Sequence, residues 1–255
     1  MLNVILDRVR SLTGHDLSTD ELLLRLTSLE EPSLQCTAEG EEVVDAIGAL
    51  ITTLYRAKRA TFSATNSLIS LELAAAQYGT KKEVASAESK IVTSTYEILP
   101  IGEDGTVTLK HTPAKDVMYI YSIANGETGT GYKVGSAVSA TEFVIEDKVI
   151  TVPTGLTGKV YVEYDFETEN AVRVRNMASN FPSAMKLRIY AYFKDKCNEN
   201  LVYSGVILCP KAKINPEQIE LALTSTGKHP VDFQMMKDYC AEEGEDELFA
   251  IIVNE

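Results

Sequence analysis

The side chains most often used in catalysis and metal binding are few and widely spaced in this sequence. His15, His111 and His229 are isolated, and neither an H-x-x-x-H nor an H-E-x-x-H spacing occurs. Each histidine is therefore expected at the surface or in a turn. Ser204 and Gly205 lie inside an apparent strand and belong to no G-x-S-x-G motif, which argues against a serine nucleophile.

Two further segments resemble ligand-binding loops only superficially. Residues 126–131, GETGTG, lack the G-x-x-x-x-G-K-[ST] order of a phosphate-binding loop and are predicted to form a hairpin loop. The acidic segment 241–247 lacks the alternating order of a calcium loop and is predicted to be a solvated turn. We therefore predict no catalytic residue, no cofactor and no bound metal ion, and a protein that is not an enzyme.

The cysteine pattern predicts synthesis in a reducing cytoplasm. Cys36, Cys197, Cys209 and Cys240 show no C-x-x-C spacing, and a chain of 255 residues has enough core to fold without disulfides. Buried free thiols are therefore expected. A bond between Cys197 and Cys209 stays open, because a hairpin would bring these two residues near each other.

The chain is strongly acidic, with 24 Lys and Arg against 37 Asp and Glu and a net charge of −13. Tight binding to nucleic acid needs clustered basic residues, so this charge disfavours it but is compatible with a surface along which DNA slides without sticking. The N-terminal segment carries Asp7, Arg8 and Arg10 and lacks the apolar core of a signal peptide. No segment approaches the ~18 apolar residues of a membrane helix, so no membrane partner is expected.

The clearest strand signals lie in the C-terminal third. Apolar and polar residues alternate from Met185 to Lys194, and a second alternating segment, LVYSGVILCP, follows across residues 197–200, so the two are predicted to pair as a hairpin. The candidate functional residues of this hairpin are basic and aromatic: Lys186, Arg188, Tyr190, Tyr192, Lys194 and Tyr203. Such residues are suited to stacking on bases or sugars, and they are equally typical of a face covered by a neighbouring subunit. Further strands are predicted over 219–223, over 231–240 and over 248–253.

Residues 96–168 have the pattern of a complete small β-domain. Short alternating segments, among them KVYVEYDF at 159–166, are separated by Gly, Pro and Asn at turn positions. The flanking sequence has a different character. We therefore expect a β-domain that is inserted into a larger body.

The N-terminal half mixes helix and strand signals. Apolar residues at helical spacing predict an amphipathic helix or a turn over 2–12, and the S-x-x-E box at Ser18 predicts a second helix or turn that ends before Pro32. The segment 34–48 is compatible with either a strand or a loop.

The next segment predicts a strand followed by a helix. Ala60, Phe62 and Ala64 alternate with polar residues, and Asn66 is positioned to cap a helix that ends at Gly79. The predicted fold is thus mainly β, a β-sandwich or barrel-like structure, with one or two short helices and an inserted small β-domain.

Three parts of the chain together resemble structural proteins of tailed bacteriophages, and tail tube subunits in particular. They are AEGEEVVDAIGALI, RAKRATFSATNSLISLELAAAQYGTKK and the C-terminal part from YAYFKD to LFAIIV. The resemblance implies an N-terminal helical or extended arm over 1–40, a tube-like β core over 41–95 and 171–255, and an Ig-like or similar β-domain inserted at 96–168.

The resemblance also implies a function. It implies a virion structural protein of the tail, made in the host bacterial cytoplasm, that assembles with itself into hexameric rings and with other tail or virion proteins. The rings would stack around a lumen through which DNA passes during ejection without specific binding, and an acidic wall would repel the phosphates. The six candidate residues of the 185–209 hairpin are expected at a subunit interface or at the lumen.

Two other classes stay open. A head decoration, neck or baseplate protein would use the same β modules without building a continuous tube. A carbohydrate-binding or adhesion module would instead use the 96–168 domain, with Tyr119, Tyr121 or Tyr132 against sugar rings, although the chain contains no Trp.

Overall fold

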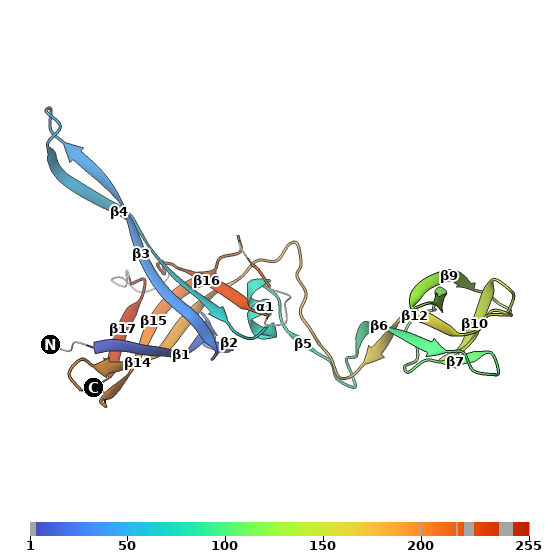
Figure 1. Ribbon diagram of the computed structural model, residues 1–255. Coiled ribbons are helices and arrows are strands. Elements are labelled where there is room, and N and C mark those ends of the chain that lie inside the picture. The colour runs from blue at the N-terminus through green and yellow to red at the C-terminus, as the bar shows by residue number, and fades with distance from the viewer. Residues whose placement is uncertain (1–3, 199, 218, 222–226, 240–246, 255) are drawn as a thin grey trace. The chain divides into compact units, whose positions relative to one another are not determined.

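The chain forms two compact units that are built mainly of strands (Figure 1). The structure, a computed structural model, describes residues 4–198, 200–217, 219–221, 227–239 and 247–254. One unit, here called the host unit, comprises residues 1–82 and 174–255, and the other, the inserted unit, comprises residues 83–173. The prediction of a mainly β fold is confirmed.

The host unit contains one large sheet and one helix. Its elements are β1 (Val4–Asp16), β2 (Leu22–Leu26), β3 (Leu29–Val44), β4 (Leu50–Asn66), α1 (Leu71–Gln77), β14 (Ala184–Asp195), β15 (Val202–Ile214), β16 (His229–Met235) and β17 (Ala250–Asn254). The strands are ordered β2-β1-β14-β15-β16-β4-β3, and β17 pairs with β15 beside β16. All pairings in this sheet are antiparallel.

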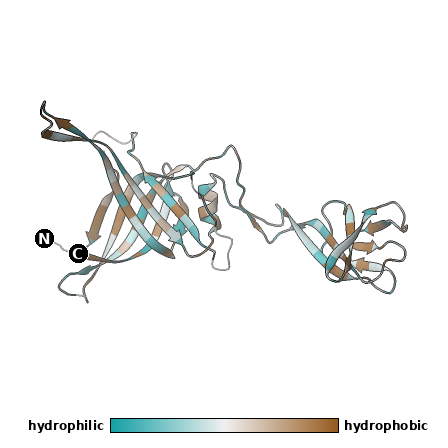
Figure 2. Ribbon diagram, turned by 45° about the horizontal axis from the view of Figure 1, so that its top comes forward, coloured by the Kyte–Doolittle hydropathy of each residue, from teal (hydrophilic) through white to brown (hydrophobic). Residues whose placement is uncertain are grey.

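This sheet curls into a nearly closed, barrel-like structure (Figure 2). Its core is formed by apolar side chains. Phe62 of β4 and Phe233 of β16 are directly opposite in register, and their ring centroids lie 6.5 Å apart in the core. The predicted β14–β15 hairpin is confirmed by the antiparallel pairing of these strands. From Met185 to Phe193 every second side chain is buried, because one face of β14 lines the core.

The two predicted N-terminal helices are wrong, because residues 4–16 and 22–26 form the strands β1 and β2. Ser18 does not begin a helix. Instead, the Asp16 carboxylate accepts hydrogen bonds from the Ser18 hydroxyl and from the backbone N–H groups of Ser18 and Thr19. These bonds lower the pKa of Asp16, and the bond from the Ser18 hydroxyl has the largest effect. They also hold a tight turn between the two strands.

Helix α1 is shorter than predicted and begins at a different residue. Its N-cap is Ser70, whose hydroxyl accepts from the Leu73 N–H at 3.2 Å, rather than Asn66. The buried side of the helix carries Leu73, which is fully enclosed in the barrel core. The predicted stop at Gly79 is confirmed, since α1 ends at Gln77 and Gly79 has a φ of +63°.

A buried polar clamp joins α1 to β16. The Ser70 N–H donates to His229 Nδ1 at 3.3 Å, so Nε2 carries the proton and donates to Gln77 Oε1 at 2.7 Å. The Gln77 amide in turn donates to the Pro230 carbonyl at 2.9 Å. His229 is only 1% exposed, which makes the surface prediction for this histidine wrong, and burial lowers its pKa.

The segment 34–48, for which strand and loop were both open, is part of a long hairpin of β3 and β4. The strands pair from Leu29 and Asn66 to Val44 and Leu50. The connecting turn is held by the Asp45 carboxylate, which accepts from the N–H groups of Ile47 and Ala49, and by Gly48 with a φ of +84°.

The predicted strand over 219–223 is not observed where the structure can test it. Ile219 and Leu221 lie outside any strand, and Leu223 lies outside the described residues. The acidic segment 241–247 also falls outside them except for its last residue. The strands predicted over 231–240 and 248–253 correspond to β16 and β17, with shifted ends.

The inserted unit contains nine strands within residues 83–173, all of them described. They are β5 (Glu83–Val84), β6 (Ile91–Pro100), β7 (Thr106–Thr108), β8 (Tyr119–Ala124), β9 (Glu127–Val134), β10 (Glu142–Glu146), β11 (Val149–Thr151), β12 (Lys159–Thr168) and β13 (Val172–Arg173). Seven of them form a sheet in the order β6-β12-β8-β9-β10-β11-β7 around a core that includes Ile120, Phe143 and Val160.

The two ends of the inserted unit lie next to each other. β5 and β13 pair as a two-stranded sheet, in which Glu83 is opposite Arg173 and the two side chains form an ion pair at 2.6 Å. We call this pair the stem. Residues 96–168 all lie within the inserted unit, and their ability to fold separately stays a prediction.

Candidate functional site

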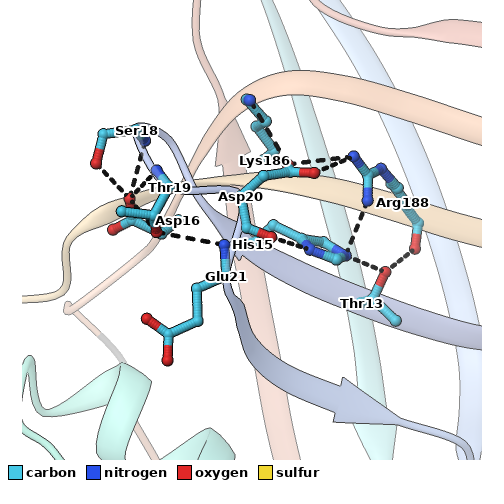
Figure 3. A network of polar contacts seen from close by, with 9 residues as sticks. All are labelled: Thr13, His15, Asp16, Ser18, Thr19, Asp20, Glu21, Lys186 and Arg188. Atoms are coloured by element: carbon cyan, nitrogen blue, oxygen red, sulfur yellow. Dashed lines mark hydrogen bonds and ion pairs between the residues drawn. The ribbon is translucent and has the colours of Figure 1, made fainter.

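The outward face of β14 carries Lys186 and Arg188, and both contact one acidic residue of the β1–β2 turn (Figure 3). The Nη2 atom of Arg188 lies 3.0 and 3.2 Å from the two carboxylate oxygens of Asp20, and Lys186 Nζ lies 3.6 Å from Oδ1. The hydrogen bond from Arg188 is the main cause of a lowered Asp20 pKa. The two strands and the turn are therefore held together by a half-exposed charge cluster.

His15 completes this cluster from β1. Arg188 Nη1 donates to His15 Nε2 at 3.2 Å, so the ring proton is on Nδ1 and is donated to the Asp20 carbonyl at 3.1 Å. Thr13 Oγ1 also lies 3.1 Å from Nε2 (Figure 3).

The other half of the same face holds Tyr190, Tyr192 and Lys194. The Arg8 guanidinium lies 5.5 Å from the centroid of the Tyr192 ring, within the range of a cation–π contact. Lys194 Nζ forms an ion pair with Asp7 at 2.9 Å, and this hydrogen bond lowers the pKa of Asp7. Tyr190, between the two groups of contacts, is 38% exposed.

Tyr203 does not share this face. It is directly opposite Phe193 in the β14–β15 ladder, so its side chain lies on the face that Phe193 occupies rather than on the face of Lys194. The structure therefore brings five of the six candidate residues together and separates the sixth. Their role at a subunit interface or a lumen stays a prediction.

All three basic side chains of β14 have an acidic partner in the same chain, Asp20 or Asp7. Such ion pairs at a solvated surface contribute little to stability, roughly 0–1 kcal/mol each. They do, however, neutralise the positive charges that would otherwise attract phosphates.

Sequence reasoning missed an exposed apolar surface of the host unit, which lies on the β3–β4 hairpin. The last pairing of β4 with β16 is at Ala60, and beyond it residues 37–59 form a two-stranded ribbon that we call the arm (Figure 1). Large apolar side chains are exposed near its end, and we call them the arm tip: Val44, Ile47, Leu50, Ile51, Leu54 and Tyr55. The sequence does indicate the turn, through Asp45 and Gly48. It does not indicate that the apolar residues are exposed, because they face no core.

The arm is held by its own ladder and by two surface ion pairs. Arg56 pairs with Glu41 at 2.7 Å and Arg59 with Glu39 at 3.5 Å, with all four side chains more than half exposed. A two-stranded hairpin is marginally stable at best in water, and the arm has this form beyond Ala60.

The described residues contain no group of three or more His, Cys, Asp or Glu side chains arranged to hold a metal ion. Cys36, Cys197 and Cys209 are free thiols. Cys36 and Cys197 are exposed, which contradicts the expectation of burial, whereas Cys209 is buried as expected. Burial raises the pKa of the Cys209 thiol to about 11, which makes it a poor nucleophile. Cys240 lies outside the described residues.

Within the part of the chain that the structure describes, no helix is long and apolar enough to cross a membrane.

Comparison with known proteins gives one result that covers almost the whole chain. No curated protein matches it. The family model described as the YomU/Tube protein family matches residues 4–246, which include the β1–β14 face, the arm and the inserted unit. This match confirms the resemblance to phage tube proteins seen in the sequence. Because the match spans more than nine-tenths of the sequence, the chain belongs to the YomU/Tube protein family.

Proposed function

We propose that this protein is a non-enzymatic phage tail tube subunit that polymerises into stacked rings and so forms a conduit for DNA ejection. Membership of a tube family supports the general class. The observation that carries the finer proposal is the arm, an ordered ribbon whose apolar tip is exposed.

The arm needs a surface to lie on. Its paired residues 37–44 extend roughly 25 Å beyond the host sheet at about 3.3 Å per residue. Over that length, nearly all side chains on both strands are exposed. Ile47, in the turn, is 90% exposed. Burial against a partner would contribute about 1.5–3 kcal/mol for each large apolar side chain that becomes fully covered.

A second copy of the chain is the partner that these surfaces fit. Contact between the arm tip of one copy and a different surface of the next is head-to-tail, and such contacts generate closed rings or continuous filaments. Other exposed apolar residues of the host unit include Ile5 and Leu6 on β1 and Ile251 and Ile252 on β17. These are candidates for the surface that receives the arm tip.

Two sheet edges offer a further route to assembly. β2 pairs with β1 only from Leu12 to His15, so residues 4–11 of β1 have no described strand on their outer side. No described strand pairs with the outer edge of β17 either. Edge-to-edge pairing of these strands between neighbouring copies would continue the sheet around a ring and would remove edges that invite aggregation.

The charge of the chain supports passage of DNA rather than binding. A ring of subunits with a net charge of −13 each repels phosphates, and the basic residues of β14 are already paired with acids. We assign the five outward residues of β14, Lys186 to Lys194, to a subunit interface, because a face rich in Lys and Arg does not make an acidic lumen. The acids that would line a lumen lie elsewhere on the chain.

Electron microscopy and sedimentation of the purified protein test the proposal. The wild type should form rings or tubes in a concentration-dependent manner, and Ile47→Asp should weaken assembly at least tenfold because it removes the most exposed apolar side chain of the arm tip. Ala46→Asp is the matched control, since it adds the same charge in the same turn and removes only a methyl group. Circular dichroism of both variants should match the wild type.

Three outcomes would contradict the proposal or part of it. Monomers at all concentrations, and in the presence of isolated tail initiation complexes, would exclude a tube subunit. Discrete rings that never stack would instead favour another virion component, such as a neck, baseplate or head decoration protein. Equal assembly by Ile47→Asp and Ala46→Asp would show that the arm tip is not the contact.

A further inference from the structure

The inserted unit carries a row of four tyrosines on the face of its sheet that points away from the core. Tyr96 lies on β6, Tyr161 on β12, and Tyr119 and Tyr121 on β8, and these three strands are adjacent in the sheet. Neighbouring ring centroids are 5.7 Å apart for Tyr96 and Tyr161, 6.3 Å for Tyr161 and Tyr121, and 6.4 Å for Tyr121 and Tyr119. The row thus crosses from β6 over β12 to β8 and then continues along β8.

These rings are held in place although they lie at the surface. Tyr121 is opposite Gly131 of β9, and a Cβ at Gly131 would lie 2.9 Å from Tyr121 Cε1, so the ring covers the glycine backbone. Lys133 Nζ lies 5.9 Å from the centroid of the Tyr119 ring. The outermost ring, Tyr96, is nevertheless 65% exposed. Fixed, exposed rings are ready to contact a ligand with little loss of side-chain entropy.

Polar groups adjoin the row in a shallow depression of about 320 Å³. Its lining includes Tyr119 and Tyr121 together with the charged side chains of Lys115, Asp116, Glu163 and Asp165. Glu163 accepts a hydrogen bond from the Tyr161 hydroxyl at 3.0 Å, and Asp165 accepts one from the Ser94 hydroxyl at 2.6 Å. Each carboxylate has lone pairs left for further donors.

We propose that this face binds a neutral polysaccharide. A sugar ring has an apolar face of C–H groups, which packs on an aromatic ring, and a rim of hydroxyls, which donate to carboxylates and accept from lysines. The tyrosine row supplies the first kind of contact, and Glu163, Asp165 and Lys115 supply the second. Tyrosine suits this role because its ring is apolar while its hydroxyl remains a hydrogen-bonding group.

The charge of the inserted unit selects a neutral glycan over an anionic one. Residues 83–173 contain fourteen Asp and Glu against seven Lys and Arg. An anionic glycan or a nucleic acid would be repelled by this excess and by the carboxylates beside the row. The site does not involve the arm or the β14 face, so it is independent of the proposed tube function.

The test uses the full chain and soluble neutral oligosaccharides, cellohexaose and chitohexaose, with oligogalacturonate as the anionic probe. Binding is followed by calorimetry and by tyrosine emission, which no tryptophan obscures because the chain contains none. At least one neutral hexasaccharide should bind, and Tyr96→Ala and Tyr161→Ala should each weaken binding about tenfold or more. Tyr161→Phe should lose less binding affinity than Tyr161→Ala. Tyr239→Ala, which removes an exposed tyrosine of the host unit, should leave the affinity unchanged.

Several results would overturn the inference. It is wrong if neither neutral probe binds, if oligogalacturonate binds better than both, or if the two alanine variants bind as well as the wild type. Weaker self-association of Tyr96→Ala without any glycan binding would identify the row as an interface between copies instead. Failure of the protein to form tubes has no bearing on these outcomes, because glycan binding is measured directly and not through assembly.

Discussion

Replacing Gln77 by Ala should destabilise the host unit by about 3 kcal/mol, although Gln77 is a polar residue in a short helix. The substitution leaves the His229 Nε2–H and the Pro230 carbonyl without the partners they have at 2.7 and 2.9 Å. Gln77 and His229 are 2% and 1% exposed, so water does not replace the lost amide without rearrangement. A buried polar group without a partner costs about 1–3 kcal/mol, and here two such groups are created.

Urea unfolding followed by circular dichroism measures this change. The two units have separate cores, so we expect two transitions, of which only that of the host unit should shift. Glu72→Ala in the same helix is the control, because it removes only a surface ion pair with Lys82 and should cost less than about 1 kcal/mol. A double-mutant cycle with His229→Phe should give a coupling energy above about 1 kcal/mol. The clamp does not stabilise the host unit if the unfolding free energy of Gln77→Ala lies within about 0.5 kcal/mol of the wild-type value, or if the effects of the two substitutions are strictly additive.

Four other predictions concern pH, domain structure, the sheet and metals. Burial lowers the pKa of His229 in the folded state, so the unfolded chain takes up a proton at a higher pH than the folded chain does. The unfolding free energy of the host unit should therefore be constant above pH 6.5 and fall as the pH drops below it. Unfolding free energies measured from pH 8 to pH 5 check this, and His229→Phe should reduce their dependence on pH. Deleting residues 96–168 with a short Gly-Ser bridge should leave the host unit folded, and an unstructured circular dichroism spectrum of the remainder would disprove it. Ile189→Pro should abolish assembly, because β14 is paired on both sides at this position, and a folding assay separates lost assembly from an unfolded subunit. Elemental analysis after dialysis should find neither zinc nor calcium, and stoichiometric metal would contradict the expected absence of a metal site.

The sequence was most informative where a strand has one face in the core. Met185, Leu187 and Ile189 alternate with polar residues because β14 lies between β1 and β15 with its inner face packed. The same reasoning identified the β14–β15 pairing. It could not assign Tyr203 to a face, because the assignment depends on the register across the turn, and a shift of one residue exchanges the two faces.

Two bulges explain why β1 looked helical. The register of β1 against β14 shifts between Leu6 and Arg8 and again between Val9 and Ser11. Each shift breaks the period of two, so the apolar residues fall at spacings of three and four, which are typical of a helix. Leu22 and Leu23 of β2 added to the error because both are exposed although they are apolar.

The arm and the tyrosine row were beyond sequence reasoning for a different reason. Ile47 and Leu50 are apolar residues without a core to face, so their pattern does not distinguish a strand from a loop. Tyr119 and Tyr121 were considered as sugar contacts from their type alone. Their alignment with Tyr96 and Tyr161 depends on the pairing of β6, β12 and β8, which brings together residues more than sixty positions apart.

The stem has a consequence for how the two activities proposed here would combine. Because Glu83–Val84 pairs with Val172–Arg173, the two ends of the inserted unit lie side by side. The entropic cost of the insertion to the host fold is therefore that of closing a short loop. A repeating assembly would then display one inserted unit for every subunit. If each tyrosine row binds a glycan weakly, many identical rows on one particle raise the effective concentration at the second and later contacts, so that the particle would adhere firmly to a surface from which a single subunit readily dissociates.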